Sequence, residues 1–377
     1  MAAMEKKDKN LNVPNLRFPE FSGEWESTPI STIADIIGGG TPDTSVDEYW
    51  GGNIQWFTPS EIGKEKYAYL SDRTITEAGL KNSSAKLLPQ GTVLLSTRAT
   101  IGECSIATAE CTTNQGFQSL VAKKNNVSSE FLYYIVAKIK REMLRRSCGS
   151  TFLEISANEL KKIHTNIPSK AEQEKLVSFL SLIDQRIETQ KKIIEKYESL
   201  IRGLCEKLTR QGTPNKIIAE CLKCHSTSLQ ESAVLDAGSY PVYGAIGICG
   251  YTDTPDVSGD GILIIKDGAS VGVTYFADGT YSFIGTLNRL TANEDINLRY
   301  VYYCLKVLNF TPYKTGLAIP HIYFKDYGKH KIWCPPLEQQ SKIADALTTI
   351  ENKIQVEKSL LAHLNSQKQY MLNQLFI

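Results

Sequence analysis

The sequence lacks the features that mark membrane proteins, secreted disulfide proteins and highly charged proteins. No apolar run approaches the ~20 residues that a bilayer-spanning helix needs, and the opening "MAAMEKKDKN" has no apolar signal-peptide core. The nine cysteines are odd in number and irregularly spaced, which favours reduced thiols. Because the net charge is +1, any nucleic-acid binding must depend on local patches. We expect a cytoplasmic protein without disulfides.

Common catalytic and metal-binding motifs are also missing. The chain has no phosphate-binding "GxxxxGK[ST]" loop and no "HExxH" pair. One cluster, "CLKCH", contains Cys221, Cys224 and His225. Haem attachment there would need an oxidising compartment, and zinc would need a second close pair of ligands, which Cys249 alone does not supply. We therefore expect buried thiols and no metal at this cluster.

The sequence is rich in heptad periodicity. Between residues 175 and 208 apolar side chains recur at alternating steps of three and four, which is the spacing of a coiled-coil seam. A lone helix of this kind would expose its apolar stripe to water, so the segment needs a partner. The seam positions are Leu176, Leu180, Ile183, Ile187, Gln190, Ile194, Tyr197, Ile201, Leu204 and Leu208.

The partner lies at the far end of the chain, between residues 342 and 375. Its series superimposes on the first when Glu357 is aligned with Gln190, and Lys368 then falls where the first copy has Ile201. Residues near the centres of two antiparallel helices face each other, so we predict that Gln190 and Glu357 approach and fix the helix register. The second series is Ile343, Leu347, Ile350, Ile354, Glu357, Leu361, Leu364, Lys368, Met371 and Leu375.

The stretches before the two helices repeat as well, though more loosely. "GTVLLSTRATIGECSIA" at 91–107 matches "GILIIKDGASVGVTYFA" at 261–277 in its glycines, its apolar strand and its small-residue turn. "EFLYYIVAKI" matches "RYVYYCLKVL", and "GSTFLEISANELKKIHTNIP" resembles "TGLAIPHIYFKDYGKHKIWCP". The predicted fold class is therefore α+β, with two mixed α/β domains that are each followed by a long helix, and with the two helices paired as a coiled coil.

These residues carry a resemblance to a known family. The first half contains "LRFPEFSGEW", "GGGTPDTS", "YWGGNIQWFTPSEI", "LLSTRATIG", "TNQGF", "GSTFLEIS" and "IPSKAEQEKLVSFLSLID". The second half contains "SYPVYGAIGICGY", "ILIIKDGASVG" and "CPPLEQQSKIADAL". In this order, and with the doubled domain and helix, the chain resembles the specificity subunits of type I restriction-modification systems over nearly its whole length.

The resemblance implies a non-catalytic subunit that recognises DNA. Each mixed domain would be a target recognition domain for one half of a bipartite site in double-stranded DNA, and the helices would pair as an antiparallel coiled coil that holds the halves apart. The family's helices also dock two modification subunits, which are adenine methyltransferases that use S-adenosylmethionine, and restriction subunits that translocate and cleave DNA join them. The absence of an Asn-Pro-Pro or Asp-Pro-Pro methyltransferase tetrad agrees with a chain that binds no cofactor itself.

The resemblance and the repeat together predict five segments. They are a tail and lead-in at 1–24, the first target recognition domain at 25–167, the first spacer helix at 168–210, the second target recognition domain at 211–334, and the second spacer helix at 335–377.

Polar residues in loops are the candidates for reading bases. Sequence readout needs side chains that reach groove edges, typically Arg to guanine and Asn or Gln to adenine. Polar turn residues often only form turns, and the basic stretch "KIKREMLRR" is more typical of a solvated helix face than of a phosphate contact, so it is left out. The predicted DNA-binding residues are Thr58, Ser60, Thr97, Arg98, Asn114, Gln115, Ser150 and Thr151 in the first domain, and Tyr243, Lys266, Ser270, Thr286, Asn288, Lys314, Thr315 and His321 in the second.

Two other classes of function stay open at this stage. The chain could be a coiled-coil adaptor whose mixed domains bind proteins without sequence-specific DNA binding. It could also be an enzyme with an unrecognised site, in which case the isolated chain would methylate or cleave DNA. The duplicated order of domain and helix favours the DNA reader over both.

Overall fold

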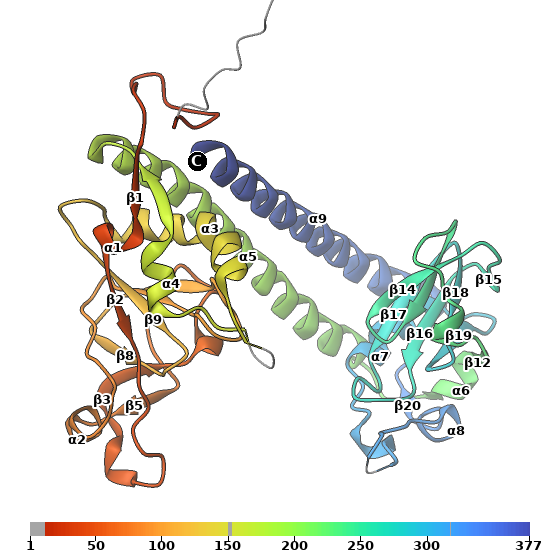
Figure 1. Cartoon of the computed structure of the whole chain (residues 1–377). Coiled ribbons are helices and arrows are strands. Elements are labelled where there is room, and N and C mark those ends of the chain that lie inside the picture. The colour runs from red at the N-terminus through yellow and green to blue at the C-terminus, as the bar shows by residue number, and fades with distance from the viewer. Residues whose placement is uncertain (1–11, 150–152, 317) are drawn as a thin grey trace, which may run out of the picture. The chain divides into compact units, whose positions relative to one another are not determined.

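The computed structural model describes residues 12–149, 153–316 and 318–377. The chain forms two compact units (Figure 1). The first comprises the chain up to Thr189 together with Leu361–Ile377, and the second comprises Gln190–Leu360. Each of the two long helices therefore contributes one segment to each unit.

The first unit combines three sheets with short helices. A five-stranded sheet has the order β2-β9-β6-β7-β4, a three-stranded sheet has the order β5-β3-β8, and β1 pairs with β10. In chain order the elements are β1 (Glu26–Pro29), α1 (Ile30–Ile33), β2 (Ala34–Gly38), η1 (Asp47–Tyr49), β3 (Trp50–Phe57), η2 (Pro59–Glu61), β4 (Tyr67–Ala68), β5 (Arg73–Ile75), α2 (Glu77–Lys81), β6 (Val93–Leu95), β7 (Cys104–Ala107), β8 (Cys111–Thr113), β9 (Gln118–Ala122), α3 (Ser129–Arg146), α4 (Ala157–Lys162) and β10 (His164–Ile167).

The second unit repeats this plan. One four-stranded sheet has the order β12-β19-β16-β17, another has the order β14-β13-β18-β15, and β11 pairs with β20. The elements are β11 (Lys216–Ile217), α6 (Ile218–Cys221), β12 (Leu222–Ser226), η3 (Glu231–Ala233), β13 (Tyr240–Gly244), β14 (Gly247–Thr252), β15 (Val257–Ser258), β16 (Gly261–Ile265), β17 (Thr274–Ala277), β18 (Thr280–Phe283), β19 (Leu287–Ala292), α7 (Leu298–Lys306), η4 (Thr311–Tyr313), α8 (Phe324–Tyr327) and β20 (Lys331–Ile332).

Strand pairing confirms the internal repeat. β6 and β7 form an antiparallel hairpin whose counterpart is β16 with β17. In the other main sheet of each unit, β3 pairs parallel to β8 and antiparallel to β5, and β13 pairs parallel to β18 and antiparallel to β14. An amphipathic helix covers the sheet that contains the hairpin in each unit, and a side chain caps its start: Ser128 for α3 and Asn297 for α7.

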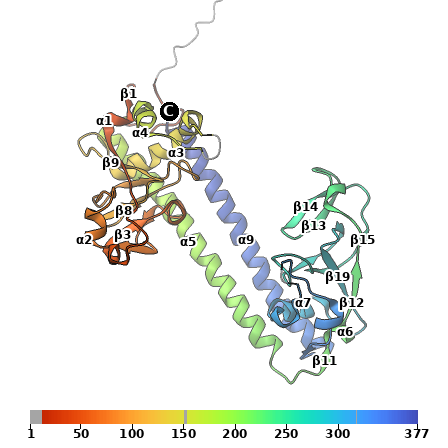
Figure 2. The same cartoon turned by 60° about the horizontal axis from the view of Figure 1, so that its bottom comes forward.

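The long helices α5 (Lys170–Thr209) and α9 (Leu337–Leu375) pair antiparallel. In the first unit Lys368 Nζ lies 2.6 Å from Asp184 Oδ1, and in the second Lys358 Nζ lies 2.6 Å from Glu198 Oε1. Residues early in α5 thus meet residues late in α9, and the two segments lie side by side within each unit (Figure 2). Every predicted seam position is buried or half-buried, which confirms the heptad reading.

The lead-in before β1 is tied to α5 although it has little regular structure. Arg17 forms a bidentate ion pair with Glu172, at 2.8 Å from Nε to Oε1 and 2.7 Å from Nη2 to Oε2. Trp25 Nε1 donates to the same carboxylate at 3.3 Å. Because Glu172 is only 2% exposed, this pairing satisfies a charge that would otherwise be buried without a partner.

The predicted approach of Gln190 and Glu357 is confirmed. Gln190 Nε2 donates to the Glu357 carboxylate and, at 3.1 Å, to its backbone oxygen. Both residues are buried in the seam, at 6% and 8% exposure. Lys353 Nζ also lies 2.6 Å from the Glu357 carboxylate. This ion pair and the Gln190 hydrogen bond lower the pKa of Glu357.

We predict that replacing both Gln190 and Glu357 by Leu raises the melting temperature by roughly 2–4 °C, because apolar residues pack a seam better than a polar pair. The same change should allow alternative pairings, which light scattering would detect as extra oligomers. In the wild type, the contribution of Glu357 is present above its ordinary pKa of 4.5 and is lost as the pH falls through the lowered value. The double variant should lose that acid sensitivity. A less stable, strictly monodisperse double variant would contradict this.

Candidate nucleic-acid interface

The turn after β6 or β16 is closed by equivalent backbone hydrogen bonds in both units, and it is one residue longer in the second. In the first, Gly102 N–H donates to Ser96 O at 3.0 Å, and in the second Gly272 N–H donates to Ile265 O at 2.9 Å. Each turn also contains an earlier residue with left-handed backbone, Ala99 at φ 62° and Gly268 at φ 101°. Such a φ is unusual for alanine, so the turn geometry is imposed by its surroundings.

A short hairpin lies against each turn. Cys148 and Glu154 exchange backbone hydrogen bonds of 3.0 and 2.9 Å, and Thr315 and His321 exchange bonds of 2.9 and 2.7 Å. The predicted DNA-binding residues Ser150 and Thr151 lie outside the described residues. We call each turn together with the described residues of its hairpin a platform: residues 96–103 with 148–149 and 153–155, and residues 265–273 with 315–316 and 318–322.

Each platform is joined to a third segment by backbone bonds, to which the Thr97 hydroxyl adds a bond to Gly116 O at 3.3 Å in the first unit. Ile155 N–H donates to Thr97 O at 3.1 Å, and Thr97 N–H donates to Gly116 O at 2.9 Å. In the second unit, Ile322 N–H donates to Lys266 O at 2.9 Å, and Lys266 N–H donates to Thr286 O at 3.0 Å. Three stretches that are distant in sequence therefore meet, and they carry most of the predicted DNA-binding residues.

Several predicted residues of the first unit stabilise their own turns. Thr58 caps η2, with its backbone N–H donating to Glu61 Oε2 at 2.6 Å, while Ser60 beside it is exposed. Asn114 Oδ1 accepts from Gly116 N–H at 2.8 Å. Thr97 is fully buried, which argues against direct contact between its side chain and a base.

Two predicted residues of the first unit are exposed and have partners that sequence reasoning missed. Gln115 accepts a hydrogen bond from Thr41 Oγ1. Arg98 Nε lies 3.8 Å from Glu154 Oε2, with both side chains nearly half exposed. An internal alignment of the repeats could have drawn attention to Glu154, because it places that residue level with the predicted His321.

The second-unit candidates divide in the same way. Tyr243 packs edge-on against Tyr281 at 5.6 Å between ring centroids, and burial raises the pKa of Tyr243. Asn288 is 7% exposed within β19, and the Thr286 hydroxyl is enclosed without a hydrogen-bond partner among the described residues. The side chains that reach solvent at the platform or beside it are those of Lys266, Ser270, Lys314, Thr315 and His321.

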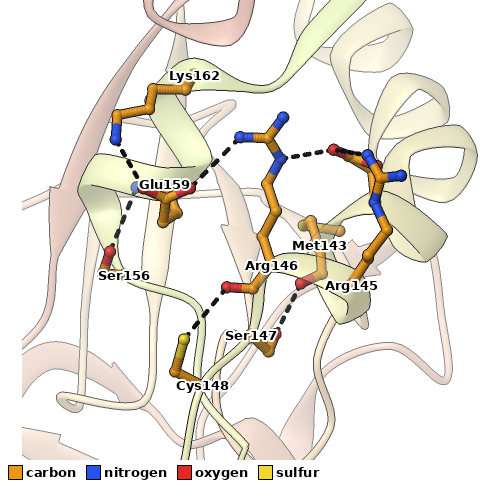
Figure 3. Close-up of polar contacts among 9 residues, drawn as sticks. Met143, Arg145, Arg146, Ser147, Cys148, Ser156, Glu159 and Lys162 are labelled. Carbon is orange, nitrogen blue, oxygen red and sulfur yellow. Dashed lines mark hydrogen bonds and ion pairs between the residues drawn. The ribbon is translucent and has the colours of Figure 1, made fainter.

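Charged residues flank the first hairpin, as Figure 3 shows. Arg145 and Arg146, at the end of α3, pair with Glu142 at 2.7 and 2.6 Å, and Arg146 reaches Glu159 of α4 at 3.4 Å. Lys162 Nζ also lies 2.7 Å from the Glu159 carboxylate. The two arginines lower the pKa of Glu142. Arg145 remains 75% exposed, so it can still face a phosphate.

The "CLKCH" residues do not converge on one point. Cys221 is buried in α6, whereas Cys224 and His225 are successive residues of β12, so their side chains point to opposite faces. His225 Nε2 lies 3.0 Å from Thr291 Oγ1. Among the described residues, no group of three His, Cys, Asp or Glu side chains could hold a metal ion. Among all the residues that the structure describes, no helix is long and apolar enough to span a bilayer.

The "GGGTP" glycines let the chain pass close to the "TNQGF" loop. Gly40 N–H donates to Thr113 O at 2.8 Å, and Trp56 Nε1 donates to Gly40 O at 2.9 Å. A Cβ built on Gly39 would lie 2.0 Å from the backbone oxygen of Asn114. No side chain fits there without movement of the loop, so glycine is required at this position.

We predict that Gly39→Ala destabilises the first unit by about 1–3 kcal/mol, the usual cost of forcing a methyl group into a packed site. Gly203→Ala is the matched control, because it adds the same methyl group to an exposed position of α5 with nothing within 4 Å. The control should gain up to ~1 kcal/mol from helix propensity. Denaturant titration measures both changes. Equal stability of the two variants would show that the loop yields freely.

The fold and the repeated platforms together define a class of protein: one with two related α/β domains, each with a platform, on a pair of antiparallel helices. The chain matches the model of the family described as "Type I restriction modification DNA specificity domain" at residues 22–199 and 218–366. This match covers most of the chain, so the protein belongs to that family.

Named relatives agree with this assignment. The chain is 24% identical to the type I restriction enzyme EcoprrI specificity subunit of Escherichia coli, over 88% of this chain and 89% of that one. It is 42% identical to the MjaIX specificity subunit of Methanocaldococcus jannaschii over 46% of this chain, a match that spans only 41% of that relative's length. The crystal structure of a type I S subunit from M. genitalium shares the fold, with a TM-score of 0.62 at 19% identity, over 97% of this chain and 99% of that one.

Proposed function

We propose that this protein is the DNA sequence-recognition subunit of a type I restriction-modification complex. Each unit would read one half of a bipartite site in double-stranded DNA. The observation that carries this proposal is that one backbone platform occurs twice, with different side chains at equivalent positions. The first has Thr97 and Arg98 where the second has Lys266 and Asp267. A repeated scaffold with changed polar side chains suits two readers of different sequences.

The chain would have no catalytic activity of its own. We propose that α5 and α9 hold the readers apart and dock two adenine-methylating modification subunits, and that restriction subunits join this assembly. Apolar side chains exposed outside the seam support a docking role for the helices: Leu182 is 63% exposed, Leu200 47% and Val356 60%. Exposed apolar residues along a helix face are typical of protein contact surfaces.

Recognition would combine exposed platform side chains with phosphate contacts from the flanking cations. The net charge of +1 leaves little non-specific attraction to DNA, so affinity must come from local contacts. In the first unit, Arg145 and Lys162 border the hairpin and remain largely exposed, at 75% and 64%. Such contacts set the register on the duplex, while base edges are read from the platform.

Domain replacement tests the proposal. Exchanging residues 25–167 for the matching domain of a relative with another target should change one half of the recognised sequence and leave the other half unchanged. The reciprocal exchange of residues 211–334 is the control and should change only the other half. Methylation-sensitive sequencing of a host carrying the complete system gives the result. A change in both halves would refute independent readers, and a complex without any sequence preference would favour the adaptor alternative.

A further inference from the structure

The two platforms carry one side-chain pair at equivalent places with its polarity reversed. In the first unit the turn supplies the cation, Arg98, and the hairpin supplies the anion, Glu154. In the second unit the turn supplies the anion, Asp267, and the hairpin supplies His321, with Nδ1 2.7 Å from Asp267 Oδ1. The backbone bridges place Arg98 opposite Glu154 and Asp267 opposite His321 in the same way.

Folding stability does not explain why these side-chain pairs are present. The backbone bonds already close each hairpin onto its turn: in the second unit Gly268 N–H donates to Pro320 O at 2.9 Å, beside the Ile322–Lys266 bond. The side chains of Asp267 and His321 are 33% and 36% exposed, and ion pairs as exposed as these contribute little to folding. The acidic residue lies on the hairpin in one unit and on the turn in the other. The platform backbone therefore requires no particular charge on either segment.

The second pair fixes the state of the His321 ring. An ionised Asp267 can only accept hydrogen bonds, so the proton must sit on Nδ1 of the imidazole. In the neutral ring, Nε2 then carries a lone pair and can only accept. Gly316 lies beside the ring, and a Cβ built on it would come within 3.2 Å of His321 Cδ2, so a larger residue there would crowd the ring. The ring is therefore oriented by its bond to Asp267, and it is one-third exposed.

We propose that His321 is a specificity-determining residue of the second reader, with Asp267 as its positioning residue. His321 Nε2 would accept a hydrogen bond from the exocyclic amine of a base, adenine N6 or cytosine N4, in the major groove. This inference rests on the proposed function. It assigns acceptor chemistry to the hairpin of the second platform, where the equivalent pair of the first platform offers the donor Arg98.

Three substitutions separate reading from positioning. His321→Asn keeps an N–H near the place of Nδ1, and so keeps the bond to Asp267, but has no atom at the place of Nε2. His321→Gln puts an amide near the place of Nε2 and should restore part of the preference. Asp267→Asn can donate to Nδ1, which frees the ring to carry its proton on Nε2 and act as a donor. His225→Asn is the matched control, because His225 occupies an exposed position of β12.

The assay uses the full chain, co-purified with its modification subunits, and a duplex library randomised in both half-sites. We expect His321→Asn to reduce the preference for an amine-bearing base at one position of the second half-site by about tenfold, as for loss of a groove hydrogen bond. Asp267→Asn should move that preference toward guanine, whose N7 and O6 accept. The first half-site should stay unchanged in every variant, and His225→Asn should change neither half-site.

Three outcomes would overturn the role of His321, the proposed function, or both. An unaltered second half-site in His321→Asn and Asp267→Asn, with intact bipartite recognition, overturns the role of His321 and leaves the proposed function standing. Loss of both half-sites together also overturns it, because a reading residue of one unit leaves the other reader intact. A wild-type complex that selects no motif overturns the proposed function, and this inference with it.

Discussion

The antiparallel seam of α5 and α9 is the constraint on which the rest of the structure depends. Neither helix can expose its apolar stripe, so each requires the other, and the pairing brings the two ends of the repeat together. The seam also continues into the cores of the units. In the first, Leu176 and Leu372 belong to the same cluster as Phe131 of α3, and in the second Ile201 and Ile343 share a cluster with Tyr300 of α7.

Each platform is therefore fixed to the helix pair through a packed core. The layer between platform and helices is mostly apolar, with polar contacts such as Tyr134 to Asp184 and Lys306 to Glu351, and these contacts carry no sequence information for DNA. The polar side chains at the platform surface can change without disturbing that layer. Arg98 and Glu154 in one unit, and Asp267 and His321 in the other, show that the acidic residue can lie on either the turn or the hairpin. A scaffold built in this way can change its target without changing its fold.

The sequence predicted those features that repeat or are periodic. The seam positions followed from heptad spacing, and the antiparallel pairing followed from the family resemblance. Together they predicted the contact between Gln190 and Glu357, and the structure confirms all three. Lys368 seemed to break the seam, but it lies 2.6 Å from Asp184 and has a partner there.

The interface was less accessible to sequence reasoning, because it depends on contacts between distant segments. Asn114 and Thr58 are polar loop residues, which made them candidates, yet their hydrogen bonds mainly hold their own turns. Thr41, Glu154 and Asp267 went unnoticed because their partners lie far away in the chain. Only the folded backbone brings the turn and the hairpin together.

The central claim is that the paired helices set the distance between two independent readers. Adding one heptad to each of α5 and α9 keeps the seam in phase and lengthens the pair by about 10 Å. At roughly 3.4 Å per base pair, the unread spacer between the half-sites should grow by about three base pairs, with the DNA twisting to follow the added rotation. The decisive measurement is the motif that the extended complex selects from a duplex library with variable spacers. The account predicts unchanged half-sites with a longer spacer, and an unchanged spacer would contradict it.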